Sequence, residues 1–177
     1  MSFPCSPRLT RLGRRMCRLC DLAFWLLGPG IALYVLVLPD QLPGRGWGSA
    51  YAGPLPPLAA LAVIAVLEVA FLPAFWGLRV LRGLFAGYAE GAVFTPGAAA
   101  GLRRFGLALL AAGLAGPPAS VLLSAALALE QPAGARGFFL TVSTADPVLL
   151  GLGAVMLVLA RAMAEAVRLA EENAAFV

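Results

Sequence analysis

Four long apolar segments dominate this 177-residue sequence and set its fold class. They cover residues 22–38, 55–78, 105–129 and 147–164. A helix needs about 20 apolar residues to cross the hydrocarbon core of a bilayer, so the first three segments are long enough, or nearly so. The fourth reaches this length if the Arg161 side chain extends to the lipid head groups while the helix continues. We therefore predict an all-α integral membrane protein, a four-helix bundle formed by one domain, residues 1–177.

The composition favours a membrane protein over a soluble one. Hydrophobic residues make up 61% of the chain and charged residues only 12%, whereas soluble domains carry roughly 25% charge. The mean hydropathy is +0.89. Residues 22–38 also resemble the core of a secretory signal, but such cores are typically about 7 to 15 residues long. We interpret this segment as a retained span.

The distribution of arginine predicts the orientation. All 13 basic residues are arginines; five precede the first apolar segment, four lie between the second and third, and two follow the fourth. Arg45 and Arg136 stand alone in the alternate loops. Because basic loops stay on the cytoplasmic side, we predict a multi-pass protein of the cell membrane with both termini in the cytoplasm. The same distribution accounts for the net charge of +4, so we expect no direct binding of nucleic acid.

Residues 1–21 have the pattern of a basic amphipathic helix. Apolar side chains recur at helical spacing beside the arginines, at Leu9, Leu12, Met16 and Leu19. This pattern predicts a helix that lies on the inner membrane surface and leads into the first span.

The residue types offer little for catalysis or metal binding. The chain has no histidine, which excludes Ser-His-Asp and Cys-His arrangements. A structural zinc site needs about four ligands, and besides Cys17 and Cys20 there is only Cys5. Glu171 and Glu172 are adjacent and so point to different sides of a helix. We expect no enzyme activity, no metal and no cofactor.

Glu68 is the one acidic residue within a predicted span. A carboxylate in the middle of a membrane is costly and often marks an ion or proton path. A structural role is the alternative, in which a protonated or hydrogen-bonded Glu68 joins two helices, with Ser120 or Ser124 as partner. The sequence leaves both interpretations open.

The cytoplasmic loop of residues 87–106 contains the start of a helix. Thr95 has a side chain suited to an N-cap, and Pro96 takes the first helical position, where no N–H is needed. On the preceding helix, Gly83, Gly87 and Gly91 follow at four-residue intervals, a spacing that favours close packing between helices.

The C-terminal segment, residues 165–177, is predicted to extend the fourth helix into the cytoplasm. Charged residues three or four apart form a ladder of ion pairs along one side: Arg161, Glu165, Arg168 and Glu172. The other side is apolar and is predicted to dock on the loop, rather than to fray as chain ends often do. This candidate cytoplasmic cap comprises Phe85, Tyr88, Gly91, Phe94, Thr95, Arg103, Arg104, Glu171, Glu172 and Asn173.

The loop and the tail together resemble a known family. The pattern is Phe85-x-x-Tyr88-x-x-Gly91-x-x-Phe94-Thr95-Pro96, then Leu102-Arg103-x-x-Gly106, and finally EAVRLAEENAAFV at residues 165–177. These motifs are similar to those of an uncharacterised bacterial family of small four-span membrane proteins, a domain of unknown function. The resemblance implies a regulatory or partner-binding role beside a cytoplasmic helix-turn-helix regulator, and it supplies no active site.

Two functions follow as predictions. The first is a non-catalytic module of the lipid bilayer that binds a regulatory partner. The alternative is a small carrier or proton-linked transporter that uses Glu68. The sequence does not specify whether the protein forms a homo-oligomer.

Overall fold

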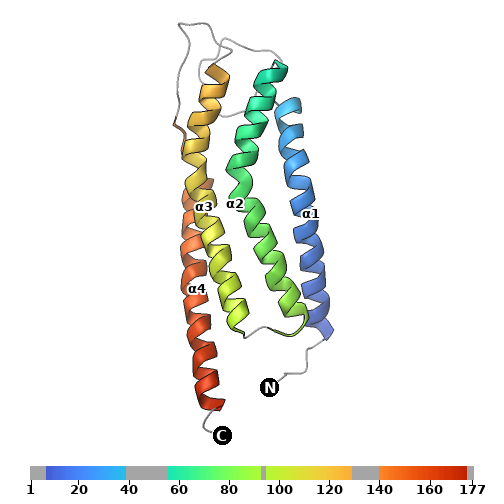
Figure 1. The fold of residues 1–177 in the computed structure, drawn as a ribbon, viewed down its shortest axis with the longest axis vertical. Helices are drawn as coiled ribbons and strands as arrows, with labels where there is room; N and C mark the ends of the chain where they lie inside the picture. Colours follow the sequence, from blue (N-terminus) through green and yellow to red (C-terminus); the bar gives the residue numbers. More distant parts are fainter. Residues whose placement is uncertain (1–6, 39–55, 93–94, 129–139, 175–177) are drawn as a thin grey trace.

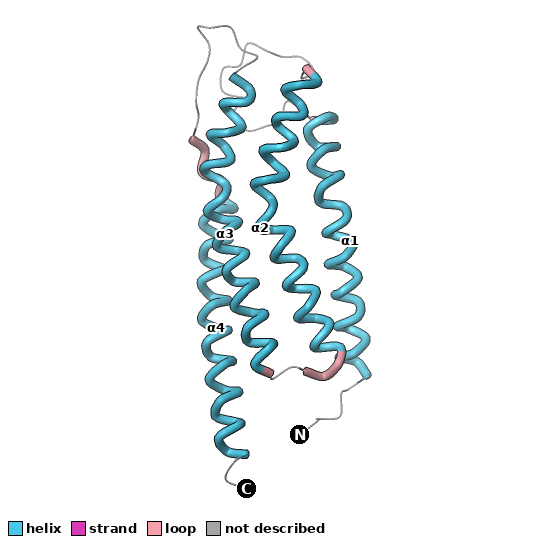
Figure 2. Tube along the Cα trace, viewed as in Figure 1, coloured by secondary structure: helices cyan, strands magenta, loops and turns pink. Residues whose placement is uncertain are grey.

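The computed structural model describes residues 7–38, 56–92, 95–128 and 140–174. These parts contain four α-helices and no strand: α1 (Pro7–Val37), α2 (Pro57–Ala89), α3 (Pro96–Ala128) and α4 (Ala145–Ala174) (Figures 1 and 2). Each helix is long and apolar enough to cross a membrane. The predicted all-α membrane fold with four spanning helices is therefore confirmed.

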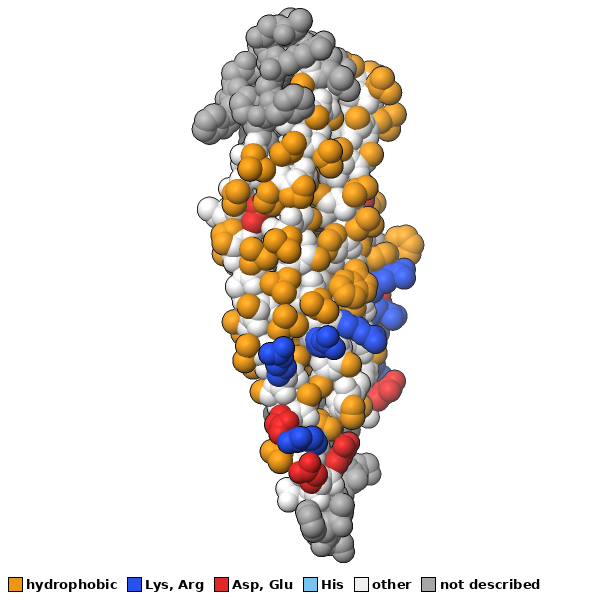
Figure 3. Space-filling model, turned by 60° about the vertical axis from the view of Figure 1, so that its left-hand side comes forward, with side chains coloured by type: hydrophobic (Ala, Val, Ile, Leu, Met, Phe, Trp, Pro, Cys, Tyr) orange, Lys and Arg blue, Asp and Glu red, His pale blue; other side chains and the backbone are white. Residues whose placement is uncertain are grey.

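All four helices are longer than a bilayer core requires. They contain 31, 33, 33 and 30 residues, so at a rise of 1.5 Å per residue each is about 45 to 50 Å long, against roughly 30 Å of hydrocarbon. A row of arginine side chains crosses the face shown in Figure 3, below its mainly apolar part. The start of α1 and the end of α4 both lie at this arginine-rich end (Figure 1).

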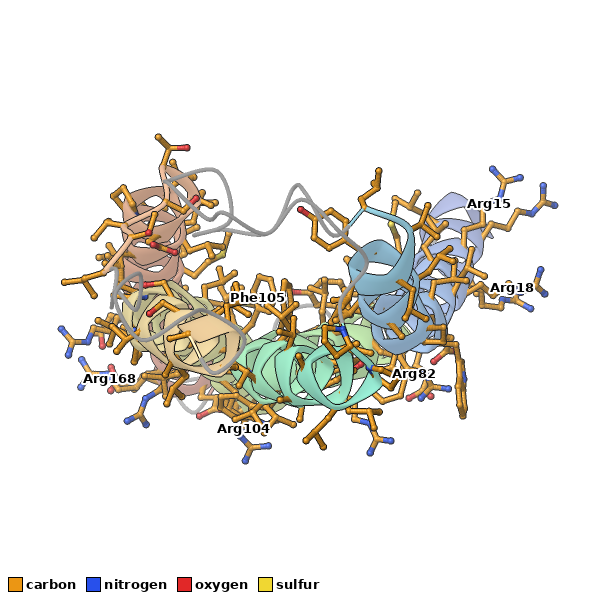
Figure 4. The ribbon with its side chains drawn as sticks, turned by 90° about the horizontal axis from the view of Figure 1, so that it is seen from above. Arg15, Arg18, Arg82, Arg104, Phe105 and Arg168 are labelled. Atoms are coloured by element: carbon orange, nitrogen blue, oxygen red, sulfur yellow. The ribbon has the colours of Figure 1, made fainter. Side chains whose placement is uncertain are left out.

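The helices pack in an open row that follows the order of the chain. Among the described residues α1 contacts α2, α2 contacts α3 and α3 contacts α4, and no other pair of helices is in contact. Seen from above, the row curves into an arc with α1 and α4 at its two ends (Figure 4). The four-helix bundle thus has a concave face and a convex face, and a buried cluster joins its first three helices: Val35, Val63, Leu123 and Leu127.

The basic segment before the first span is part of α1. The helix continues without a break from Pro7 through Val37, so the predicted basic helix and the first span form one element. Gly13 lets this basic part pack on α2, because a Cβ there would lie 2.9 Å from both the Ala89 Cβ and the Phe85 carbonyl oxygen. The missing side chain lets the first turns of α1 lie directly against the last turns of α2.

Small residues also make the other two helix interfaces close. Between α3 and α4, a Cβ on Gly106 would lie 3.1 Å from the Gly153 carbonyl oxygen, and one on Gly153 would lie 2.9 Å from that of Gly106. Between α2 and α3, a Cβ on Gly77 would lie 3.2 Å from the Ala108 Cβ. In lipid, helix association depends on this kind of backbone approach, because apolar side chains gain little by leaving lipid tails.

The predicted packing role of Gly83, Gly87 and Gly91 is wrong. A Cβ on Gly83 or Gly87 would meet no atom within 4 Å. Gly91 instead ends α2 with a φ of 85°. The N–H groups of Gly91 and Ala92 donate to the Tyr88 and Gly87 carbonyls at 3.2 and 2.9 Å, a Schellman motif, which glycine favours because it has no Cβ.

Candidate functional site

Phe85 and Tyr88 of the predicted cap form an edge-to-face pair in the last turns of α2, with ring centroids 6.3 Å apart. The start of α1 lies against this end of α2, because a Cβ on Gly13 would be 2.9 Å from both the Phe85 carbonyl oxygen and the Ala89 Cβ. Among the described residues α4 contacts α3 alone, so the C-terminal tail lies against the part of the 87–106 segment that begins α3 and not against Phe85 and Tyr88 at the end of α2. Phe94 lies outside the described residues.

The tail extends α4 along the start of α3. Val167 is buried, and Arg103 and Glu171 line one groove of about 610 Å³ between the two helices. Arg168 bridges Glu165 at 2.5 Å and Glu172 at 3.7 Å, as the spacing predicts. Exposed pairs of this kind contribute little stability, so Val167 holds the tail more firmly than its charges do. Asn173 is exposed.

Thr95 has the capping role that the sequence indicates. Its hydroxyl oxygen accepts a hydrogen bond from the Ala98 N–H at 3.2 Å, at the start of α3. Arg103 and Arg104, two turns further along, are exposed. The loop motif therefore consists largely of helix-ending and helix-starting residues.

Glu68 lies between α2 and α1. A Cβ on Gly28 would be 3.4 Å from the Glu68 Oε1, so the carboxyl group lies close to the backbone of α1. The hydroxyls of Ser120 and Ser124 donate to backbone carbonyls of α3, at 2.7 and 2.8 Å. The Glu68 carboxyl group therefore lies beside α1, and its pairing with Ser120 or Ser124 of the third span stays a prediction.

Exchanging Glu68 for glutamine is expected to leave folded yield and thermal stability close to wild type. Glutamine keeps the size and hydrogen-bonding groups of the side chain, and in the described part of the chain no arginine forms an ion pair with Glu68. Expression yield and thermal unfolding of the purified protein measure this. A loss of proton flux in reconstituted vesicles, at unchanged stability, would instead assign Glu68 to a proton path.

The concave face contains an apolar cavity of about 680 Å³. Phe105 points toward this face, whereas the neighbouring Arg104 points to the convex side (Figure 4). On α2 and α3, seven of the lining residues are alanine or glycine: Ala70, Ala74, Gly77, Ala108, Ala112, Gly116 and Ala119. Glu68 does not line this cavity. The cavity therefore lies along the faces of α2 and α3 that carry small residues.

One end of the cavity is polar. Asp146, at the start of α4, is only 7% exposed, and its Oδ2 accepts a hydrogen bond from the Ser143 N–H at 2.8 Å. The Ser120 hydroxyl accepts one from the Thr141 N–H at 2.9 Å. A Cβ on Gly116 would clash with the Asp146 carboxylate, so glycine is needed there for the acid to fit.

Sequence reasoning missed Asp146, although a local signal was present. Ser143-x-x-Asp146 before an apolar run resembles a capping box, in which the acid binds the N–H of the capping residue. The bond from Ser143 to Asp146 has this geometry, and the Ala145 N–H donates to the Ser143 hydroxyl at 3.3 Å. The capping hydrogen bond at the start of α4 thus uses one oxygen of the Asp146 carboxylate, which is buried at the polar end of the cavity.

Comparison with known proteins assigns the family. Residues 35–177 match the family described as "Protein of unknown function (DUF2975)", which covers well over half of the chain. No curated protein and no solved structure matches the chain. The resemblance carried by the loop and the tail is confirmed, since both lie inside the matched residues. This four-helix membrane protein belongs to the DUF2975 family, whose function is unknown.

Proposed function

We propose that the protein is a non-catalytic membrane module that binds a transmembrane helix of a partner protein in its concave cavity. The open row of helices supports this most directly, because α1 and α4 do not contact each other and the cavity between α2 and α3 lies on the face they leave open. A partner with a cytoplasmic regulatory segment would connect this cavity with the regulatory role that the family resemblance implies.

The lining of the cavity also suits a helix. Ala70 and Ala74 of α2 lie four residues apart, and Ala112 and Ala119 of α3 lie seven apart, so each pair is on one helix face. Small residues at this spacing let the backbone of another helix approach closely, which is the main source of helix association in lipid. Acyl chains gain less from such a surface, because it offers them few side-chain atoms to contact.

Site-specific photocrosslinking in native membranes tests the proposal. A photoreactive residue at Ala74 or Ala112 is expected to give an adduct with one protein that contains a transmembrane segment. The matched controls are Leu72 and Leu114 on the same helices, which are 58% and 64% exposed and do not line the cavity. An adduct of twice the mass of the chain would indicate a second copy instead. Lipid adducts alone from all four positions would refute the partner.

A small carrier is the second candidate, and Asp146 favours it. A buried carboxylate at the polar end of an apolar cavity suits an amphipathic solute with a cationic group. Because Glu68 is not among the lining residues, we assign this alternative to Asp146. Saturable uptake into vesicles that Asp146→Asn abolishes, at unchanged stability, would favour the carrier over the partner-binding module.

We also propose that the arginine-rich end faces the cytoplasm. In a background without Cys5, Cys17 and Cys20, single cysteines at Gly48 and Gly134 should react with an impermeant thiol reagent added outside the cell. Cysteines at the exposed positions Gly97 and Asn173 should react only after the membrane is permeabilised. Labelling of Asn173 in intact cells would reverse this orientation.

A further inference from the structure

Beyond the proposed function, and independently of it, we propose that a groove between α2 and α3 at the arginine-rich end binds the head group of an acidic phospholipid. The groove has a volume of about 580 Å³ and is lined by side chains from both helices. It includes Arg104, which points to the convex side of the arc (Figure 4). It is thus separate from the concave cavity.

Glycines make the groove hollow. Gly83 and Gly87 of α2 line it, and a Cβ on either would meet no atom within 4 Å. Gly97 of α3 also lines it, and a Cβ there would meet only the Thr95 Oγ1, at 3.8 Å. Glycine is a poor residue for the interior of a helix, and helix packing does not require it at Gly83 or Gly87. A bound molecule over this surface supplies a reason for both.

Two arginines flank the groove at one level. The antiparallel helices place Gly77 against Ala108 and Leu84 against Gly101, which brings Arg79 of α2 and Arg104 of α3 close to the same height. The Arg79 guanidinium lies over the Phe24 ring, with its Cζ 4.9 Å from the ring centroid. The groove is therefore flanked by two cations from different helices, one of them held in place by α1.

The charge of the groove is unbalanced. No acidic residue is among those that line it, and within the described ranges neither Arg79 nor Arg104 forms an ion pair. The nearby Arg82 differs, because its Nε lies 2.6 Å from the Asp21 Oδ1. The start of α3 carries the partial positive charge of a helix N-terminus, which adds to the positive field at Thr95 and Gly97. An anion is the complementary ligand.

The position of the groove identifies that anion as a lipid. The apolar runs of α2 and α3 end at Arg79 and Arg104, so the guanidinium groups lie where the hydrocarbon gives way to head groups. Trp76, 44% exposed, lines the groove one turn closer to the membrane centre, and tryptophan is enriched at this interface. A phosphate between the two arginines places the polar head group over the glycines and the acyl chains past Trp76. Basic pockets between spanning helices recognise acidic lipids in this way.

Thermal unfolding of the purified full-length protein in detergent tests the site. Added phosphatidylglycerol is expected to raise the melting temperature, because a ligand that binds only the folded state stabilises it, whereas phosphatidylcholine should not. Two variants should lose this rise: Gly83→Leu, which fills the groove without changing charge, and the double variant Arg79→Gln/Arg104→Gln. The control is Arg14→Gln/Arg15→Gln, which removes two exposed arginines of α1 and should keep the full rise.

Each contrary outcome has a definite meaning. An equal rise with phosphatidylcholine would show that charge is not recognised, and an equal rise with glycerol phosphate would show that the acyl chains are not needed; either would overturn the lipid site. The full rise in Gly83→Leu would show that the groove is not the binding place. If that variant does not fold, the full rise in the double arginine variant decides against the proposal in the same way. None of these results depends on the concave cavity, which these substitutions do not line.

Discussion

Replacing Gly153 with leucine is expected to separate α4 from α3 and to lower the free energy of unfolding by about 3 kcal/mol. A Cβ at this position would lie 2.9 Å from the Gly106 carbonyl oxygen and 2.8 Å from the Leu110 Cγ. The first of these neighbours is helix backbone, which cannot rotate away as a flexible side chain can. The two helices must therefore move apart, and α4 loses its contact with α3, the one helix against which it packs in the described part of the chain.

Gly151 supplies the matched control for this substitution. It lies in the same helix only two residues away, yet a Cβ there would meet no atom within 4 Å. Gly151→Leu should keep or slightly raise stability, since leucine favours a helix over glycine by roughly 0.8 kcal/mol. Unfolding of both variants in mixed detergent micelles measures the difference. Equal losses in the two would show that α4 does not pack on α3 through Gly153.

Gly13→Leu is expected to detach the first turns of α1 from α2 and to expose Phe85 and Tyr88 to protease. The added Cβ would lie 2.9 Å from the Phe85 carbonyl oxygen, again a backbone atom. The expected loss of stability is about 1 to 3 kcal/mol. Chymotrypsin cleavage after these two aromatic residues reports the exposure. Gly30→Leu, in the same helix with open space around it, should leave cleavage unchanged.

Removal of the C-terminal tail distinguishes the packing of α1 on the end of α2 from the tail docking that the sequence predicts. Truncation before Leu169 should not increase cleavage at Phe85 and Tyr88, because α4 packs on α3 and α1 covers the end of α2. Rapid cleavage after truncation, with no change in Gly13→Leu, would restore the tail as the covering element.

Local signals in the sequence predicted the helices well. Hydropathy alone identified the four spans, because a lipid-exposed helix must be apolar along about 20 residues. The N-cap at Thr95 and the ion pairs around Arg168 were also predictable, since both depend on residues three or four apart in the chain. The family resemblance was carried by the loop and the tail, and the match to residues 35–177 confirms it.

The choice of neighbour for each helix was not predictable in the same way. Nothing in the sequence distinguishes Gly83 and Gly87 from Gly153 as packing residues. Of these three glycines, only Gly153 lies at a helix interface. In a membrane the apolar faces of a helix are equally compatible with lipid, so hydropathy does not show which face meets another helix. The direction in which Glu68 faces and the burial of Asp146 depend on this pairing, and neither could be derived from spacing along the chain.

The open row has a consequence for how the protein is made. Among the residues that the structure describes, every contact between helices joins two helices that are consecutive in the chain, and α1 and α4 do not touch. Structures rich in sequence-local contacts assemble quickly, and domains generally form in the order of synthesis. Each new helix can dock on the helix that was synthesised just before it, while the ribosome is still translating the following helices. The concave face is then open from the moment α3 joins α2, which gives a helix from another chain access to it before α4 has been inserted.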